Sequence, residues 1–380
     1  MSDFAQSGLI STFQQLNEAH LPALEEELTG LARESPIALV LPCHGADLDR
    51  PALAHIVAEL RGAAFLQEII VSMNGVDSAA VARAKKIFSP LPVRFLWNDG
   101  PETGALLAGF APGKGLNVWG ALGLLCAEAR VKIVALQDCD VVSFRRGTLA
   151  RLCYACAHPK LGYAFSKMYY SRATDRLYGR VSRLFFSPLL HAIVRMAGHH
   201  PLLDFLLSFR YPLAGECAFK REVGERLALS SDWGLETGML CELFREIDPR
   251  QVCQVAGGSA YDHKHQPAAG ALATMSAGIA RALFDQLARE GLDSAIQTSI
   301  GDAYRREALV AVHRSANLAL INGLPFDEPG ERAIVALFAA QLSIAASERT
   351  TTTTLPAWST MAQSAPDFLP RLLASYSKSA

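Results

Sequence analysis

The chain contains 380 residues, of which 50% are hydrophobic and 19% are charged, with a formal net charge of −1 at pH 7. A chain of this length and composition can bury a sizeable core in one large α/β domain or two smaller ones, and intrinsic disorder is excluded. Because the charge is nearly balanced, no overall attraction draws the chain to nucleic acid or to an anionic membrane, so any anion site must be local.

The segment before the first strand, residues 1–35, predicts one amphipathic helix that ends near Gly30. It has neither the basic nor the apolar segment of a secretory signal peptide. The longest apolar stretch, residues 181–209, is interrupted by charged residues, histidines and a proline, so it predicts buried or interfacial helices and no membrane span. Cys153 and Cys156 lie in a helical pattern without a second cysteine pair and predict two reduced core thiols. A cytoplasmic location follows from these features.

Strand and helix patterns alternate from Pro36 to the middle of the chain. The expected strands are short apolar runs at residues 37–41, 68–73, 93–97 and 131–137. The helical patterns between them lie at residues 51–62, 78–88 and from about 115 through Arg130. This alternation is typical of βαβ units with a largely parallel sheet, so the predicted fold class is α/β.

After Asp140 the alternation loosens into helices and short strands, with strands expected at residues 162–168 and 217–220. From about residue 271 the pattern is helical, over residues 271–290, 304–320, 331–346 and 368–375. The chain therefore divides into an N-terminal helix and three larger regions, at residues 1–35, 36–141, 142–270 and 271–380. The helical C-terminal region is expected either to pack on the sheet or to form a dimer interface.

Two carboxylates stand directly behind the expected strand at residues 131–137, in the run Asp138-Cys139-Asp140. Open α/β sheets bind ligands at the carboxyl ends of their strands, and two acidic groups one residue apart can converge there on one divalent cation. Mg²⁺ held by one or two carboxylates typically carries a diphosphate. A helix cap or a loop salt bridge is the plainer interpretation of the same pair.

Basic residues occur in two places that suit anions. Lys114 stands between two glycines at an expected helix N-terminus, where backbone N–H groups already favour an anion. Residues 175–183 bring Arg180 and other arginines close to Gly179, and arginine forks suit phosphate or carboxylate groups. The alternatives are a solvated loop lysine and structural salt bridges.

Glu236 and His263 complete the set of candidates. Glu236 stands in an apolar segment flanked by glycines, where a carboxyl group can bind an acceptor hydroxyl or cap a helix. His263 and His265 would point to opposite faces of an extended backbone, so they are not expected to share one metal ion. One histidine completing a metal site begun by Asp140 is the more economical interpretation, and a solvent-facing polar loop is the other.

The order of these segments resembles that of the retaining GT-A glucosyl-3-phosphoglycerate synthases, with the mannosyl-3-phosphoglycerate synthases more distant. The resemblance covers roughly residues 36–270. Its motifs are short but follow one another in the same order: Gly113-Lys114-Gly115 through Trp119, Asp138-Cys139-Asp140, Gly179-Arg180-Val181-Ser182, Pro212-Leu213-Ala214-Gly215-Glu216, Gly234-Leu235-Glu236-Thr237-Gly238 and the His263 loop.

The chain departs from the family pattern at two motifs. Its first strand ends in Pro42-Cys43-His44-Gly45-Ala46-Asp47, where the family usually has a Pro-x-Leu-Asn-Glu-Glu type of run. Tyr261 stands where the family commonly has an arginine, and His265 where it has an asparagine.

The resemblance implies a GT-A fold with a helical C-terminal extension, in which residues 36–141 bind a nucleotide sugar and residues 142–270 bind the acceptor. It implies donor contacts from Pro42, Cys43, Asn74, Lys114 and Asp138. It implies Mg²⁺ or Mn²⁺ held by Asp140 and His263, and acceptor contacts from Arg180, Gly215 and Glu236. The catalytic residues would be Glu236, Asp140 and Lys114. The partners would be UDP- or GDP-glucose and 3-phosphoglycerate, with no nucleic acid, and a homodimer is expected.

The implied reaction moves glucose from a nucleoside diphosphate to the 2-hydroxyl of 3-phosphoglycerate with retention of configuration. A divalent ion would neutralise the leaving diphosphate, and a positive pocket would position the acceptor. Glu236 as a nucleophile and front-face attack by the acceptor are both compatible with the sequence.

Several alternatives remain open from the sequence. Synthesis of mannosyl-3-phosphoglycerate or of glucosylglycerate is chemically close. A phosphatase of the haloacid-dehalogenase type fits the run from Asp138 to Val142, with Asp138 as nucleophile, although that fold expects its motif on the opening strand. A non-catalytic protein that binds nucleotide sugars is the third alternative.

Overall fold

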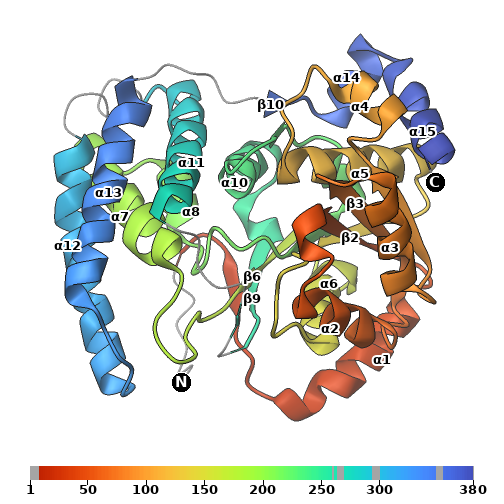
Figure 1. Cartoon of the computed structure of the whole chain (residues 1–380). Helices are drawn as coiled ribbons and strands as arrows, with labels where there is room; N and C mark the ends of the chain where they lie inside the picture. The colour runs from red at the N-terminus through yellow and green to blue at the C-terminus, as the bar shows by residue number, and fades with distance from the viewer. Residues whose placement is uncertain (1–7, 259–260, 263–268, 293–299, 348–353, 380) are drawn as a thin grey trace.

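The computed structural model describes residues 8–258, 261–262, 269–292, 300–347 and 354–379, and it confirms the predicted α/β class (Figure 1). Eight strands form one sheet in the order β1-β9-β6-β7-β5-β2-β3-β4. Their bounds are Ser11–Phe13 (β1), Ile37–His44 (β2), Leu66–Asn74 (β3), Val93–Trp97 (β4), Ile133–Leu136 (β5), Phe165–Tyr169 (β6), Cys217–Lys220 (β7) and Val252–Ala256 (β9). A separate two-stranded sheet pairs β8 (Leu229–Ser230) with β10 (Thr354–Leu355).

The helices include several whose bounds agree closely with the sequence patterns. They are Leu21–Leu31 (α1), Pro51–Leu60 (α2), Ser78–Phe88 (α3), Pro101–Leu107 (α4), Lys114–Glu128 (α5), Arg146–Ala157 (α6), Ser187–Ala197 (α7), Pro201–Leu207 (α8), Arg221–Gly224 (α9), Leu235–Glu246 (α10), Ala269–Arg289 (α11), Ile300–Ile321 (α12), Glu328–Ser347 (α13), Trp358–Ser364 (α14) and Phe368–Ser379 (α15). Short 3-10 segments lie at Glu18–His20 (η1), Gly45–Asp47 (η2) and Pro249–Gln251 (η4), and a π-helical segment lies at Val181–Phe186 (η3).

The direction of β7 decides at which edge of the sheet its flanking residues lie. Within the eight-stranded sheet the paired neighbours are parallel, except that β7 is antiparallel to both β5 and β6. The residues that precede β7 therefore lie at the edge where the parallel strands end.

Helices cover both faces of the sheet, which explains the continuous apolar runs in the sequence. Along β2, Ala38 and Val40 belong to the core formed with α5, whereas Leu39 and Leu41 belong to the core formed with α2 and α6. A strand that is buried on both faces has no polar alternation, as the sequence of β2 shows.

The N-terminal segment corrects one prediction. Residues 1–35 do not form a single helix, because Ser11–Phe13 pairs in parallel with β9 at the edge of the sheet. The side chain of Thr12 accepts a hydrogen bond of 2.8 Å from Gln254 Nε2 in that register. Strand pairing with a distant segment overrides the helical pattern here, and the helix α1 begins only at Leu21.

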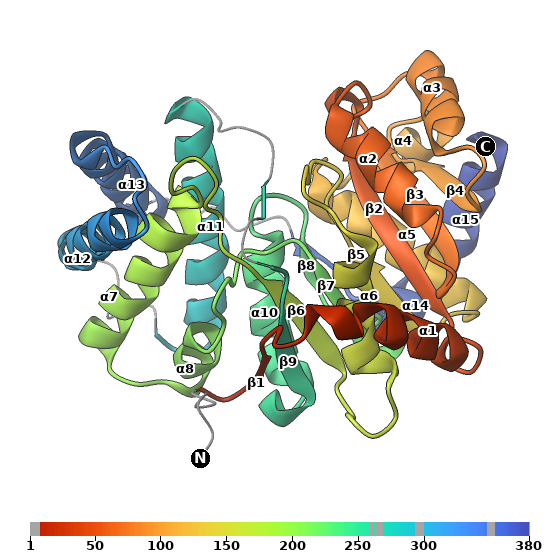
Figure 2. The same cartoon turned by 90° about the horizontal axis from the view of Figure 1, so that it is seen from below.

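The helices α7, α11, α12 and α13 form a helical lobe beside the β1 end of the sheet (Figure 2). The apolar stretch at residues 181–209 supplies η3, α7 and α8, which confirms the prediction of buried helices. In the part of the chain that the structure describes, no helix has the length and apolar character needed to cross a membrane. Cys153 and Cys156 are buried in α6 as free thiols, as predicted.

The end of the chain leaves the helical lobe and returns to the sheet. After β10, the segment α14–α15 packs on α4 and α5, on the far side of the molecule from α12 (Figure 1). The rings of Trp119 and Trp358 stack with centroids 4.0 Å apart. The indole nitrogen of Trp358 donates to the carbonyl of Trp119, and that of Trp119 donates to the carbonyl of Pro356. This return was not evident from the helical pattern of residues 271–380.

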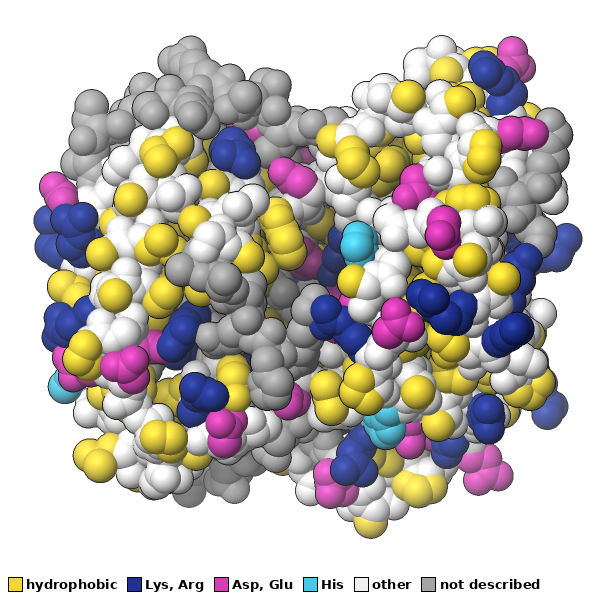
Figure 3. Space-filling view, viewed as in Figure 1, with side chains coloured by type: hydrophobic (Ala, Val, Ile, Leu, Met, Phe, Trp, Pro, Cys, Tyr) yellow, Lys and Arg dark blue, Asp and Glu magenta, His cyan; other side chains and the backbone are white. Residues whose placement is uncertain are grey.

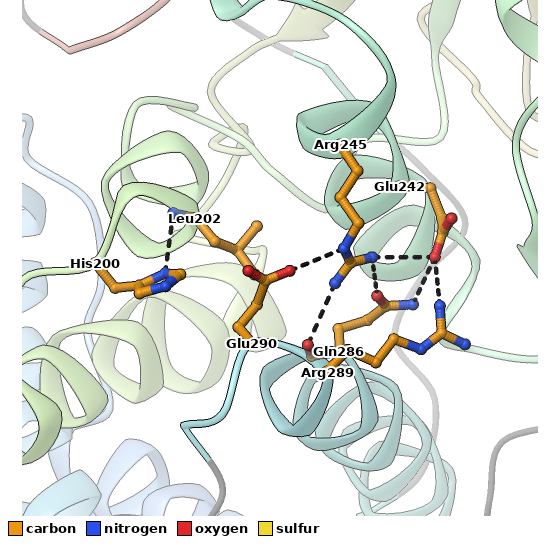
Figure 4. A network of polar contacts seen from close by, with 7 residues as sticks. All are labelled: His200, Leu202, Glu242, Arg245, Gln286, Arg289 and Glu290. Carbon is orange, nitrogen blue, oxygen red and sulfur yellow. Dashed lines mark hydrogen bonds and ion pairs between the residues drawn. The ribbon is translucent and has the colours of Figure 1, made fainter.

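A polar network ties α10 to α11 (Figure 4). Glu242 Oε1 accepts from Arg245 Nη1 at 3.1 Å and from Arg289 Nη1 at 2.8 Å. Arg245 also donates to Gln286 Oε1 at 2.5 Å and to Glu290 Oε1 at 2.8 Å. Because α10 carries Glu236 in its first turn, the network fixes the helix that presents this carboxylate.

Candidate active site

Several segments end or begin at one edge of the sheet, and the functional candidates lie on them. The strand β2 ends at His44, β3 ends at Asn74, and Asp138 follows β5 by two residues. Gly215 comes two residues before the antiparallel β7, so it lies at the same edge. Open α/β sheets bind their ligands at this edge. On the side seen in Figure 3, the surface is hollowed between the helical lobe and the sheet, with basic and acidic side chains around the hollow.

Lys114 joins two of the candidate residues directly. It is the first residue of α5, and its Nζ lies 2.6 Å from Asp138 Oδ1 and 2.8 Å from Glu236 Oε1. Glu236 lies in the first turn of α10, where the helix dipole favours a carboxylate. The three side chains therefore meet in one cluster, which rules out a solvated loop lysine.

Burial and neighbouring charges set the protonation of this cluster. Burial opposes the charge of Lys114, but the carboxylates of Asp138 and Glu236 outweigh it and hold the pKa of the ammonium well above its ordinary value. Burial raises the pKa of Asp138 to about 6, against the opposing effect of Lys114. The nearby carboxylates of Glu216 and Asp140 add to that increase in pKa. Lys114 is therefore cationic, while Asp138 changes its charge close to neutral pH.

The backbone at Gly215 passes very close to the cluster. A Cβ atom at this position would lie 2.4 Å from Asp138 Oδ2 and 2.5 Å from Lys114 Nζ. A side chain at this position would have to displace the carboxylate of Asp138 or the ammonium of Lys114, and glycine lets the segment before β7 approach the ion pair without that shift.

A buried carboxylate lies beneath the cluster and was not among the predicted site residues. Glu216 is fully buried, and its Oε2 accepts from Tyr170 Oη at 3.0 Å. Its Oε1 accepts from Gln137 Nε2 at 3.3 Å, and the same nitrogen donates to Tyr261 Oη at 3.1 Å. The rings of Tyr170 and Tyr261 stack at 3.9 Å. Burial and the charge of Glu216 raise the pKa of both phenols well above the ordinary value, so both remain donors.

A buried lysine supports the same segment. Lys167 on β6 is 2% exposed, and its Nζ donates to the carbonyl of Ala214 at 2.6 Å. Burial lowers the pKa of Lys167. The sequence offered one signal for this residue, since a lysine in the middle of an apolar strand needs a buried partner.

The candidate donor residues divide into buried and half-buried positions. Pro42 and Cys43 are both buried in β2, and Cys43 has no exposed surface. Asn74 is half-buried at the end of β3, and its Oδ1 accepts from Asn117 Nδ2 at 2.8 Å.

Arg180 is held by the helical lobe. Its Nε donates to Glu331 Oε1 at 2.7 Å, and Arg183 Nη1 lies 2.5 Å from Glu331 Oε2. The side chain of Glu331 is 4% exposed and that of Arg180 is 22% exposed. A Cβ atom at Gly179 would lie 3.3 Å from Tyr211 Oη, so the Arg180 segment runs beside the segment that leads to Gly215.

The candidate metal ligands are only partly described. Asp140 is half-buried in the turn after β5, while His263 lies outside the described residues. The backbone N–H of Val142 donates to the carbonyl of Asp262 at 2.9 Å, and the N–H of Asp262 donates to Ser143 Oγ at 2.9 Å. The carboxylate oxygens of this turn are the ligand type that Mg²⁺ and Mn²⁺ prefer, so the residues present suit such an ion. Among the described residues alone, no three acidic, histidine or cysteine side chains form a metal-binding group.

Comparisons with known proteins agree on one family. The chain is 36% identical over 364 residues to the glucosyl-3-phosphoglycerate synthase of Persephonella marina, covering 92% of this chain and 90% of that protein. It is 29% identical over 341 residues to the glucosyl-3-phosphoglycerate synthase of Methanococcoides burtonii, covering 83% and 82% of the two chains. No protein-family model matches the chain.

The fold is similar to that of solved glucosyl-3-phosphoglycerate synthases from Mycobacterium tuberculosis. One of these structures contains Mn²⁺, uridine diphosphate and phosphoglyceric acid; it has a TM-score of 0.57 and 21% identity, covering 73% of this chain and 86% of that one. Another contains Mn²⁺, UDP-glucose and phosphoglyceric acid, with a TM-score of 0.58 and 22% identity over 74% and 88% of the two chains. At this level of identity the similarity establishes the GT-A type of fold.

Proposed function

Since the chain belongs to the family of glucosyl-3-phosphoglycerate synthases, we propose that it transfers glucose from a nucleoside diphosphate to the 2-hydroxyl of 3-phosphoglycerate. The anomeric configuration is retained. The observation that carries the proposal is the convergence of Lys114, Asp138 and Glu236 at the carboxyl edge of the sheet.

The donor side is assigned to residues 36–141. The nucleotide sugar lies along the ends of β2 and β3, with contacts from Pro42, Cys43 and Asn74. Lys114 and Asp138 lie next to its diphosphate, where the cationic lysine stabilises the charge that develops on the leaving group. Mg²⁺ or Mn²⁺ held by Asp140 and His263 would supply further neutralisation of that charge.

The acceptor side is assigned to residues 142–270. Arg180 binds the phosphate of 3-phosphoglycerate, because a guanidinium fork suits a phosphate and remains charged at every working pH. Gly215 leaves room for the acceptor beside the ion pair, and Glu236 orients its hydroxyl group. Holding this hydroxyl near the anomeric carbon removes much of the entropic barrier to reaction.

A panel of substrates tests the reaction. UDP-glucose, GDP-glucose and the two corresponding mannose donors are each combined with 3-phosphoglycerate or glycerate in Mg²⁺. We expect nucleoside diphosphate release only when a glucose donor and 3-phosphoglycerate are both present, and an anomeric proton in the product with the configuration of the donor by NMR. Release of phosphate from an aryl phosphate would indicate a phosphatase, and donor binding without turnover would indicate a non-catalytic protein.

The metal site is tested separately. Asp140→Ala and His263→Ala are expected to remove the Mg²⁺-dependent activity without lowering the melting temperature of the metal-free protein. Full turnover in either variant would contradict the assigned ligands.

The proposal extends to the assembly and location of the enzyme. The helices α11–α13 form the interface of a homodimer, which light scattering tests directly. The enzyme works in the cytoplasm, in keeping with its eight free cysteines.

A further inference from the structure

A series of hydrogen-bonded amides connects the proposed donor side with the C-terminal helix. Asn117 Nδ2 donates to Asn74 Oδ1 at 2.8 Å, and Asn98 Nδ2 donates to Asn117 Oδ1 at 2.8 Å. The hydroxyl of Tyr376, near the end of α15, donates to Asn98 Oδ1 at 2.5 Å. Four residues from four separate segments therefore form one continuous hydrogen-bonded path.

The three members of this path behind Asn74 are closed off from water. Asn98 is 3% exposed, Asn117 is 1% exposed and Tyr376 is 4% exposed. The Tyr376 hydroxyl reaches Asn98 over Gly120 of α5, where a Cβ atom would lie 2.5 Å from Tyr376 Oη. In a buried site each amide group must find its partner within the protein, so the hydrogen bonds fix the orientation of each side chain.

Ser72 fixes the polarity of the path independently. Its hydroxyl donates to the backbone carbonyl of Asn117 at 2.7 Å, which uses its single proton. Ser72 Oγ can then only accept, and it does so from Asn98 Nδ2 at 2.9 Å. The oxygen of the Asn98 amide must therefore face Tyr376, which supplies the donor that this oxygen requires.

The polarity passes along the path to Asn74. Since Asn98 presents its nitrogen to Asn117, the oxygen of Asn117 faces Asn98 and its nitrogen faces Asn74. Asn74 must accept with its oxygen, which places its Nδ2 on the opposite side of the amide. Asn74 is the one half-buried amide of the path, at the end of β3.

We propose that Tyr376 is a positioning residue for donor binding: together with Ser72 it holds the Asn98 amide, and through Asn98 and Asn117 it holds the Asn74 amide so that Asn74 presents its N–H groups to the nucleotide sugar. The donor atom that meets Asn74 is accordingly a hydrogen-bond acceptor, such as a carbonyl or hydroxyl oxygen. The inference rests on the proposed function, which places Asn74 in the donor site.

Tyr376→Phe tests the path with the loss of a single oxygen atom. We expect the KM for the nucleotide sugar to rise about fivefold, the effect of one lost neutral hydrogen bond, while kcat and the KM for 3-phosphoglycerate stay unchanged. Tyr304→Phe is the matched control, because Tyr304 is also buried and its hydroxyl donates to the carbonyl of Leu184 at 2.7 Å in the helical lobe. Both variants lose one buried hydrogen bond and should lose similar stability, but only Tyr376→Phe should change the donor KM.

Variants of Asn74 test the polarity of the path and distinguish the role of Tyr376 from the location of the donor site. Asn74→Asp keeps an oxygen for Asn117 but offers the ligand no N–H, so it should raise the donor KM at least as much as Asn74→Ala. An Asn74→Asp enzyme with the donor KM of the wild type would overturn the assigned polarity. If Asn74→Ala raises the donor KM while Tyr376→Phe behaves like Tyr304→Phe, the role of Tyr376 is refuted and the donor site stands. If Asn74→Ala has no effect, the donor site itself is misplaced.

Discussion

The proposed donor and acceptor sides of the site are supported by different kinds of interaction. Behind Asn74 the support is a path of neutral amides and hydroxyls, in which Asn98 is 3% exposed. Behind Arg180 the support is an ion pair with Glu331, in which Arg180 keeps 22% of its side chain exposed. A neutral amide can be buried completely once its hydrogen bonds are made, whereas a buried charge carries a large desolvation cost.

The difference matches what each side has to recognise. A nucleotide sugar presents donors and acceptors in a fixed pattern, so the protein must fix the direction of each hydrogen bond. The acceptor presents charged groups, for which the position of a guanidinium matters more than the polarity of a single bond. Substitutions on the two sides should therefore change different kinetic constants.

The largest effect is expected at Lys114, where the two sides meet. Lys114→Ala removes the cation between Asp138 and Glu236, and kcat/KM should fall about 100- to 1,000-fold, as when one preorganised electrostatic group is lost. Steady-state kinetics with both substrates varied measures this effect. Lys160→Ala, at an exposed position, is the control and should retain full activity. A loss in Lys114→Ala confined to the KM of one substrate would show that Lys114 serves only that side.

A smaller and one-sided effect is expected at Arg180. Arg180→Ala should raise the KM for 3-phosphoglycerate about 10- to 100-fold, the range for a charge-assisted hydrogen bond, with little change in the donor KM. Glu331→Gln should raise the same KM less, because the guanidinium remains but loses the carboxylate that holds it.

Glu328→Gln provides the control for this comparison. Glu328 lies one turn before Glu331 in α13 and makes an exposed ion pair with Arg332, so its loss should leave both KM values unchanged. If Arg180→Ala raised the KM for 3-phosphoglycerate and the KM for the nucleotide sugar equally, Arg180 would not belong to the acceptor side alone.

The next effect is expected where the two sides come closest. Gly215→Ala forces a methyl group against Asp138 and Lys114, and kcat should fall about tenfold, as expected when reacting groups are displaced by a fraction of an ångström. Gly109→Ala is the control, because nothing lies within 4 Å of a Cβ atom at that position. A Gly215→Ala enzyme with normal kcat would mean that the ion pair can move without loss of function.

Local patterns predicted the strands and the residues at their ends. β4, β7 and α3 have the bounds that the apolar runs and helix signals indicated. Lys114 and Glu236 could be identified because charged residues close to glycines in apolar surroundings are unusual. Asp138 could be identified because it stands with Asp140 directly behind a buried strand.

Long-range contacts could not be predicted in this way. Nothing near Tyr376 or Glu331 in the sequence indicates that one supports Asn98 and the other supports Arg180, because these partners are brought together only by the packing of α15 and α13. The strand at Ser11–Phe13 was missed for the same reason, since its stability comes from pairing with β9.

The smallest effect concerns pH and the charge of Asp138. Its pKa of about 6 lies above the ordinary value near 4, so the metal-free folded protein binds this proton more tightly than the unfolded chain. The stability of the metal-free protein should therefore fall as the pH rises from 4 to 6. A divalent cation at Asp140 favours the ionised form of Asp138, so the increase in melting temperature on adding Mn²⁺ should be larger at pH 7.5 than at pH 5.

Asp138→Asn isolates this contribution, because it cannot take up the proton. The proposed ligand His263 would also compete with protons in this range, and that competition remains in the variant. The apparent affinity for Mn²⁺ should accordingly change less with pH in Asp138→Asn than in the wild type. The difference between the two proteins should be up to about tenfold per pH unit. Identical pH profiles for the two proteins would show that Asp138 is not electrostatically coupled to the cation and belongs to the acceptor side through Lys114 and Glu236 alone.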